Sequence, residues 1–153
     1  MIVGYVVHIQ PVTSNHAYAT NRKGRRFMTT EARRYKKEIA EAMAAADVKR
    51  GRPQFKPTAT IELSIACLYP RSAEKGGTAA MYTIAGRMRK RDATGPLKLT
   101  EDAVSEYIGI DDSQNLSVHI HKRSHDEIGC KIVIAVSEID DGAAVMHRKR
   151  RIC

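Results

Sequence analysis

Four short runs with strand-like apolar patterns restrict this chain to folds built around a sheet. Through residues 60–67 apolar and polar side chains alternate, which predicts a strand with one buried face. The apolar members of that run are Ile61, Leu63, Ile65 and Cys67. Residues 2–9, rich in Val, Ile and Tyr, and residues 116–121, which alternate by two, predict two more strands. Residues 130–139 are apolar on both faces, so we expect them to form a central strand.

Two segments repeat apolar residues every three or four positions, which is typical of amphipathic helices. The first begins after a capping threonine, Thr29 or Thr30, and continues to about Asp47. Its predicted buried side consists of Ala32, Tyr35, Ile39, Ala42, Met43 and Ala46. The second begins near Pro96, a residue favoured at the first helical position, and Gly109 is expected to end it in a left-handed cap.

The order of these elements is strand, helix, strand, loop, helix, strand, strand. It predicts one α/β (α+β) domain in which a mixed β-sheet packs with two main helices. A length of 153 residues supports one core. We place this domain at residues 1–140. Residues 71–91 lack periodicity and are longer than most connections, which predicts a mobile basic loop, and residues 141–153 form a basic tail.

Several classes of protein are disfavoured by simple counts. No run approaches 18 apolar residues, and the N-terminal apolar run lacks a basic flank and a cleavage site, so neither a membrane span nor secretion is expected. The three cysteines form no C-x-x-C pair, which disfavours a disulfide framework and a structural zinc site. A cytoplasmic protein is the resulting expectation.

The charge of the chain indicates a polyanionic partner. The sequence holds 26 Lys and Arg against 17 Asp and Glu, a net charge of +9. Eight of the bases lie between Arg22 and Lys37, four more between Arg87 and Arg91, and a third group spans residues 148–151. Such clusters are typical of a surface that binds phosphates.

One acidic segment interrupts this basic background. Residues 92–112 contain six acids and one base, Lys98, a net charge of −5, whereas the other residues contain 25 bases and 11 acids. Converging carboxylates beside a phosphate-binding surface are what a Mg²⁺ site requires, because the ion removes their repulsion for phosphate. The alternative is the solvated acidic face of one helix. Asp92 and Asp112 flank the second helix, roughly 24 Å apart along a straight helix, so they meet if the chain enters and leaves near one sheet edge or across a subunit interface.

The order of residues around this acidic segment resembles that of a known family. Arg91-Asp92 is followed by Lys98, then by Asp102-Ala103, and then by Ile110-Asp111-Asp112-Ser113-Gln114. The N-terminal half adds Pro11, Ser14-Asn15, Tyr18, Gly24-Arg25, Thr30 and Tyr35. Together, across residues 5–136, these motifs resemble the RusA family of Holliday-junction resolvases.

The resemblance implies a homodimer that cuts four-way DNA junctions with Mg²⁺ held by aspartates, in a bacterial or phage-infected cell. It implies that Asp92 and Asp112 are catalytic metal ligands and that Lys98 is a catalytic or phosphate-contacting base. Asp111 and Asp102 match family acids whose roles are less defined.

One departure concerns the metal ligands. The family pattern opens with D-x-D-N, whereas this chain has Asp92-Ala93-Thr94-Gly95, and a threonine hydroxyl is a weak Mg²⁺ ligand. Either another acid compensates, with Glu101, Asp111 and Asp102 as candidates in that order, or the activity is weak or absent. The predicted metal ligands are therefore Asp92, Asp112, Asp111 and Glu101. Lys98, Glu101 and Asp102 share one helix face, and a surface salt-bridge cluster is the alternative explanation of that trio.

DNA phosphates are expected to contact the basic loop and the polar face of the first helix. The predicted DNA-binding residues are Arg22, Lys23, Arg25, Arg26, Arg87, Arg89, Lys90 and Arg91. The main alternative function is a non-catalytic branched-DNA-binding protein on the same scaffold with a degraded metal site, which is consistent with Thr94. A protein of structured RNA fits the charge but leaves the acidic segment unexplained.

Overall fold

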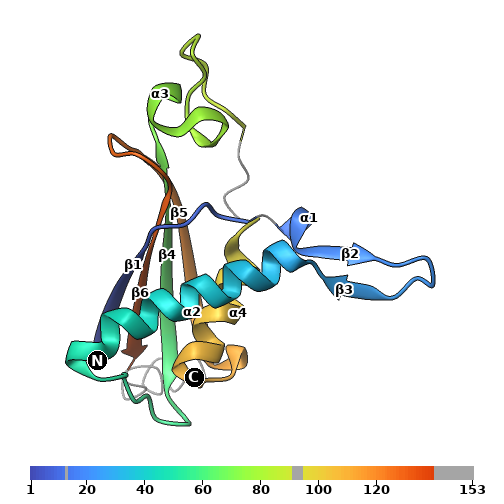
Figure 1. The fold of residues 1–153 in the computed structure, drawn as a ribbon. Coiled ribbons are helices and arrows are strands. Elements are labelled where there is room, and N and C mark those ends of the chain that lie inside the picture. The colour runs from blue at the N-terminus through green and yellow to red at the C-terminus, as the bar shows by residue number, and fades with distance from the viewer. Residues whose placement is uncertain (13, 91–94, 140–153) are drawn as a thin grey trace, which may run out of the picture.

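A four-stranded mixed sheet carries two long helices on one face (Figure 1). The computed structural model describes residues 1–12, 14–90 and 95–139. The strand order is β1-β6-β4-β5, with β4 and β5 parallel and the other pairs antiparallel. The bounds are β1 Ile2–Val7, β4 Thr60–Pro70, β5 Asn115–His125, β6 Lys131–Ile139, α2 Thr30–Arg50 and α4 Leu97–Ile108. The predicted fold class, a mixed sheet with two main helices in one α+β domain, is confirmed.

Strand β6 occupies a central position, as its two apolar faces predict. It pairs with β1 on one side and with β4 on the other, so that Ile134 lies between Tyr5 and Ile65. Along β6 the buried residues are Ile132, Ile134 and Val136, beneath the helices. The intervening side chains face the side of the sheet that the two helices leave uncovered, where β1 exposes Ile2 and Val6.

Helix α2 begins where its capping residue predicts. The Thr29 hydroxyl accepts a hydrogen bond from the Ala32 backbone N–H at 3.2 Å. The helix continues to Arg50, beyond the predicted end at Asp47, because Asp47 lies four residues after Met43 and belongs to the buried stripe. Ala46, predicted to be buried, is exposed instead.

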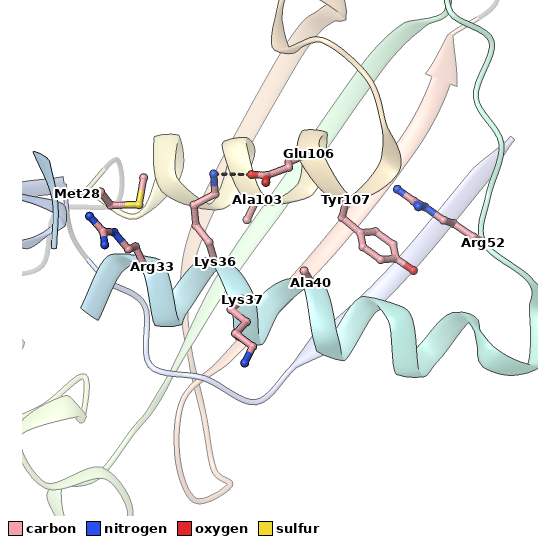
Figure 2. A pocket seen from close by; sticks show the side chains of 9 residues that line it. All are labelled: Met28, Arg33, Lys36, Lys37, Ala40, Arg52, Ala103, Glu106 and Tyr107. Carbon is pink, nitrogen blue, oxygen red and sulfur yellow. Dashed lines mark ion pairs between the residues drawn. The ribbon is translucent and has the colours of Figure 1, made fainter. Parts of the chain in front are cut away.

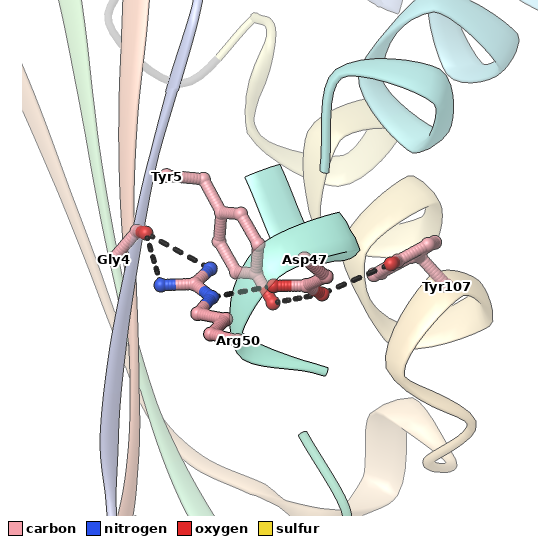
Figure 3. A network of polar contacts seen from close by, with 5 residues as sticks. All are labelled: Gly4, Tyr5, Asp47, Arg50 and Tyr107. Atoms are coloured by element: carbon pink, nitrogen blue, oxygen red, sulfur yellow. Dashed lines mark hydrogen bonds and ion pairs between the residues drawn. The ribbon is translucent and has the colours of Figure 1, made fainter. Parts of the chain in front are cut away.

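Asp47 is the centre of a buried polar network (Figure 3). Its Oδ2 accepts hydrogen bonds from the Tyr5 hydroxyl at 3.1 Å and from the Tyr107 hydroxyl at 2.9 Å. Its Oδ1 accepts one from Arg50 Nε at 2.6 Å, and the Arg50 guanidinium also donates to the Gly4 carbonyl at 3.2 Å. The network therefore joins β1, α2 and α4 through one carboxylate.

Helix α4 begins and ends as predicted. It starts at Leu97, directly after Pro96, and Gly109 follows its last residue in the left-handed conformation, with φ 76° and ψ 34°. Near its first turn the Thr100 and Tyr35 hydroxyls are 2.7 Å apart, and both side chains are buried. This contact fixes the start of α4 against the second turn of α2.

A β-hairpin occupies part of residues 11–28, although the Pro, Ser, Asn, Thr and Gly content of residues 11–26 predicts a loop there. After a single helical turn, α1 (Ser14–Ala17), the strands β2 (Tyr18–Thr20) and β3 (Arg26–Met28) pair and project away from the sheet (Figure 1). Between them the Asn21 side chain accepts the backbone N–H groups of Lys23 and Arg25 at 2.9 and 3.0 Å. The loop prediction is wrong for these strands because three-residue strands are too short to show a periodicity.

Residues 71–90 also hold short elements. They contain α3 (Ala73–Gly76), the 3₁₀ turn η1 (Gly77–Ala79) and an isolated bridge between Tyr82 and Met88. The segment folds back on β4, since the Met81 N–H donates to the Pro70 carbonyl at 2.6 Å. The mobility predicted for this loop is untested and stays a prediction. The predicted tail, residues 141–153, lies outside the described residues.

Within residues 1–12, 14–90 and 95–139, no helix combines the length and the apolar character that crossing a bilayer requires.

Candidate active site

The first two turns of α4 carry a lysine and two acids on one face. Lys98 Nζ lies 3.0 Å from Asp102 Oδ1 and 3.9 Å from Glu101 Oε2. The Lys98 side chain is 56% exposed, whereas Glu101 is 14% exposed and Asp102 23%. The shared face that their spacing predicts is therefore present, with the cation outward and both carboxylates partly enclosed.

Asn115, the first residue of β5, meets this face. Its amide Nδ2 donates to Glu101 Oε1 at 2.8 Å. The carboxylate fixes the orientation of the amide, because the reversed amide would place two oxygen atoms against each other. Asn115 Oδ1 is buried and accepts no hydrogen bond from the described part of the chain. Sequence reasoning missed Asn115, although it lies three residues after Asp112.

The turn that leads from α4 to β5 is held by its own side chains. Asp111 Oδ1 accepts the Ser113 N–H at 2.9 Å, and the Asp111 N–H donates to Gln114 Oε1 at 3.0 Å. Gln114 Nε2 in turn donates to the Pro57 carbonyl at 2.9 Å. These contacts fix the 3₁₀ turn η2 (Asp112–Gln114) against the segment that precedes β4.

The two aspartates predicted to hold the metal are not both described. Asp92 lies outside the described residues, and so does the side chain of Asp112, whose backbone belongs to η2. Among the side chains that the structure describes, no three His, Cys, Asp or Glu gather closely enough to hold a metal ion. The metal roles of Asp92 and Asp112 therefore stay predictions.

The described side chains nevertheless suit a hard cation. Mg²⁺ prefers oxygen ligands, and the enclosed Glu101 carboxylate and the Asn115 amide oxygen are both of that kind. A buried acceptor left without a hydrogen bond costs about 1 to 3 kcal/mol, which a bound ion or water removes. Glu101 and Asn115 therefore fit one part of an oxygen-donor site, which residues outside the described part of the chain would complete.

A family comparison decides the class of protein. The model of the endodeoxyribonuclease RusA family matches residues 8–137. The chain belongs to the RusA family. Membership implies Holliday-junction resolvase activity and binding of junction DNA, as the sequence motifs suggest. No curated protein matches the chain in a sequence comparison.

The DNA-binding residues predicted for this RusA-family chain fall on two segments. Arg22, Lys23 and Arg25 are exposed around the hairpin tip, and the Arg26 guanidinium lies 4.4 Å from the centre of the Tyr18 ring. The second set lies on either side of Met88, one of the two residues of the Tyr82–Met88 bridge. Arg87 and Lys90 are exposed, and Arg89 is half-buried. Arg91 lies outside the described residues.

A concavity at the base of the hairpin connects one of these segments with α4. Its volume is about 450 Å³, and it is lined by Tyr18, Arg26, Phe27, Met28 and Lys98. Lys98 is therefore next to Arg26, although 72 residues separate them in the sequence. In this RusA-family fold the hairpin and the first turn of α4 form one cationic surface.

Proposed function

We propose that this chain is a Mg²⁺-dependent endonuclease that resolves four-way DNA junctions. The observation that carries the proposal is the contact between Glu101 and Asn115. Asn115 follows Asp112 by three residues, and Glu101 follows Asp92 by nine. Their contact brings the chain that leaves α4 back to the early turns of that helix. Such a return supports one condition under which Asp92 and Asp112 can share an ion, namely that the chain enters and leaves the helix near one edge of the sheet. Along a straight helix the two aspartates would stay apart.

Three carboxylates are proposed to hold the ion. Asp92 and Asp112 correspond to the family's aspartates, and Glu101 supplies the carboxylate that Thr94 lacks. The Asn115 amide orients Glu101 through their hydrogen bond, as residues behind metal ligands commonly do. Asp111 is a further candidate, although its Oδ1 already accepts the Ser113 N–H.

Hydrolysis of a phosphodiester needs an activated water, stabilised charge on phosphorus and a stabilised leaving oxygen. A bound Mg²⁺ would lower the pKa of a water and polarise the phosphoryl oxygen. Lys98 places a second cation beside the scissile phosphate, where its effect is largest as charge develops in the transition state. Its exposed side chain can turn from Asp102 toward the substrate.

The substrate and the oligomeric state follow from the same proposal. A homodimer with two-fold symmetry would match the near two-fold symmetry of a four-way junction and place one site on each of two opposing strands. The hairpin tip and residues 87–91 would contact DNA phosphates, which selects by shape and charge rather than by base sequence.

The second candidate function is a junction-binding protein that no longer cleaves. Thr94, in place of an aspartate, is the observation that favours it. Both candidates bind the same DNA, so cleavage with Mg²⁺ or Mn²⁺, against EDTA, separates them.

Asp112→Asn and Asp92→Asn test the metal ligands. Each change should lower Mg²⁺-dependent junction cleavage at least about a hundredfold, because a neutral amide holds the ion weakly. Junction binding in EDTA should persist or tighten, since a charge that repels phosphate is removed. Cleavage is measured on a labelled four-way junction and binding by fluorescence anisotropy.

Glu41→Gln is the matched control, because Glu41 is an exposed acid of α2 and pairs with Lys37 at 3.5 Å. It should leave cleavage unchanged. Full activity in both aspartate variants would reject the metal assignment, and wild-type binding without cleavage in either metal would favour the second candidate.

A further inference from the structure

Helix α2 separates its charges onto two sides of its buried stripe. The charged residues of α2 that line a groove against α4 are all bases, Arg33, Lys36 and Lys37. Along residues 31–38 the opposite side carries Glu31, Arg34 and Glu38, which is two acids against one base. The polar face of this helix is therefore not uniformly suited to phosphate, and half of it would repel DNA.

A groove runs between the basic side of α2 and α4 (Figure 2). Its volume is about 540 Å³, and Arg33, Lys36, Lys37 and Arg52 all line it. Its acid, Glu106, is neutralised by Lys36, whose Nζ lies 2.7 Å from Glu106 Oε2. The groove thus presents a net positive charge along its length.

The groove continues into the concavity beside the proposed active site. Met28 lines both hollows, and the second hollow also contains Arg26 and Lys98. At the other end the Arg52 guanidinium lies 4.8 Å from the centre of the Tyr107 ring. A cation-lined track therefore leads from Lys98, along α4, to Arg52.

We propose that this track holds the sugar–phosphate backbone of one strand of a duplex arm, where that arm leaves the active site. The axes of packed helices lie about 8 to 10 Å apart, so the groove between them admits one backbone but not a whole duplex. From Lys98 to Tyr107 the helix rises about 14 Å at 1.5 Å per residue. That length holds at most about four phosphates, the number reached where the strand runs parallel to the duplex axis at 3.4 Å of rise each.

This assignment rests on the proposed function and adds to it the path of the arm. It uses residues that the predicted DNA-binding set omits, Arg33 and Arg52 at the two ends of the groove. The track does not include Arg34, which is next to Arg33 in the sequence but lies on the opposite side of α2.

The test compares two double variants that remove the same charge. Arg33→Gln/Arg52→Gln removes the bases at both ends of the groove, and Arg34→Gln/Lys49→Gln removes two exposed bases of the same helix that do not line the groove. Junction affinity is measured in EDTA over a series of salt concentrations. The groove variant should bind about tenfold more weakly, and its slope of log K against log salt should be shallower by about 1.8. The control should bind as the wild type does.

A second measurement uses wild-type protein and altered DNA, so it does not depend on how a variant folds. Neutral methylphosphonate linkages replace about four consecutive phosphates next to the crossover, in each arm strand in turn. One such substitution should weaken wild-type binding about tenfold and should not further weaken the groove variant.

Equal losses in the two double variants, or equal sensitivity of wild type and groove variant to every neutral patch, would overturn the inference. Those results leave the proposed function standing as long as the wild type cleaves a junction with Mg²⁺. A wild type that neither binds nor cleaves junctions defeats the proposed function itself.

Discussion

At Asp47, a carboxylate occupies a position of α2 that the buried stripe would assign to an apolar side chain. Its side chain is 3% exposed, yet three donors, from Tyr5, Tyr107 and Arg50, satisfy it. Burial alone would raise the pKa of Asp47, but the hydrogen bonds from Arg50, Tyr107 and Tyr5 outweigh burial and lower it. Burial and the Asp47 hydrogen bond raise the pKa of Tyr5 to about 12.

Asp47→Asn should lower the free energy of unfolding by about 1 to 3 kcal/mol at neutral pH, because the amide keeps the volume but turns one acceptor into a donor. Urea denaturation measures the loss. Glu41→Gln, an exposed acid on the same helix, should leave the unfolding curve unchanged.

The stability difference between the wild type and Asp47→Asn should also depend on pH. Since the folded-state pKa of Asp47 lies below its ordinary value of 3.8, its contribution to stability is present above pH 3.8 and is lost as the pH falls through the folded-state value. The difference between wild type and Asp47→Asn should therefore shrink below about pH 3.8. A difference that stays constant in acid would show that the charge of Asp47 does not stabilise the fold.

At the scale of elements, two glycines that end helices adopt different backbone conformations. Gly109 after α4 has φ 76° and ψ 34°, which Asn also tolerates, whereas Gly51 after α2 has φ 78° and ψ 152°, a region nearly restricted to glycine. An added Cβ meets nothing within 4 Å at either position, so backbone strain alone decides the effect of a substitution.

Gly109→Ala should cost about 1 to 2 kcal/mol of stability, and Gly109→Asn should cost less. At Gly51 both Ala and Asn should cost about 1 to 3 kcal/mol. Thermal and urea unfolding of the four variants measure these costs. Equal stability of Gly109→Ala and Gly109→Asn would contradict the left-handed cap as their cause.

Regular patterns over six or more residues were enough to predict the main elements. The strands of the sheet and both long helices could be predicted because each buries one regular stripe, and the caps at Thr29 and Gly109 located two helix ends. The hairpin could not be predicted, because its three-residue strands are too short to show a periodicity. Residues 71–90 could not be predicted, because contacts with distant segments hold them, such as the hydrogen bond from the Gly129 N–H to the Lys75 carbonyl at 3.3 Å.

The candidate site likewise combines features that the sequence predicts with features that it does not. The face shared by Lys98, Glu101 and Asp102 follows from their spacing on one helix. The contact of Glu101 with Asn115 joins two elements across 14 residues, so no local pattern reveals it. The concavity that brings Arg26 beside Lys98 is equally a product of tertiary structure.

At the scale of the whole molecule, the helices cover one face of the sheet, and the other face exposes apolar side chains. Ile2 is 79% exposed and Val6 56% exposed there. Larger exposed apolar surfaces commonly mark places where another protein binds.

The proposed homodimer should sediment at twice the 17.0 kDa mass of one chain, in EDTA and without DNA. The reason is that two cuts on opposing strands of a junction need two active sites in one assembly. Sedimentation equilibrium measures the mass directly. A species of 17.0 kDa at micromolar concentration would contradict the dimer.

The central place of β6 also determines when this molecule can fold during its synthesis. β1 pairs with β6, so β1 cannot join the sheet before β6 has left the ribosome, about 125 residues after β1. At about 5 to 20 residues per second, β1 stays without its pairing strand for roughly 6 to 25 s. During that interval the nascent chain depends on whatever shields it from aggregation, and a ribosome that stalls before β6 releases a product that cannot complete its sheet.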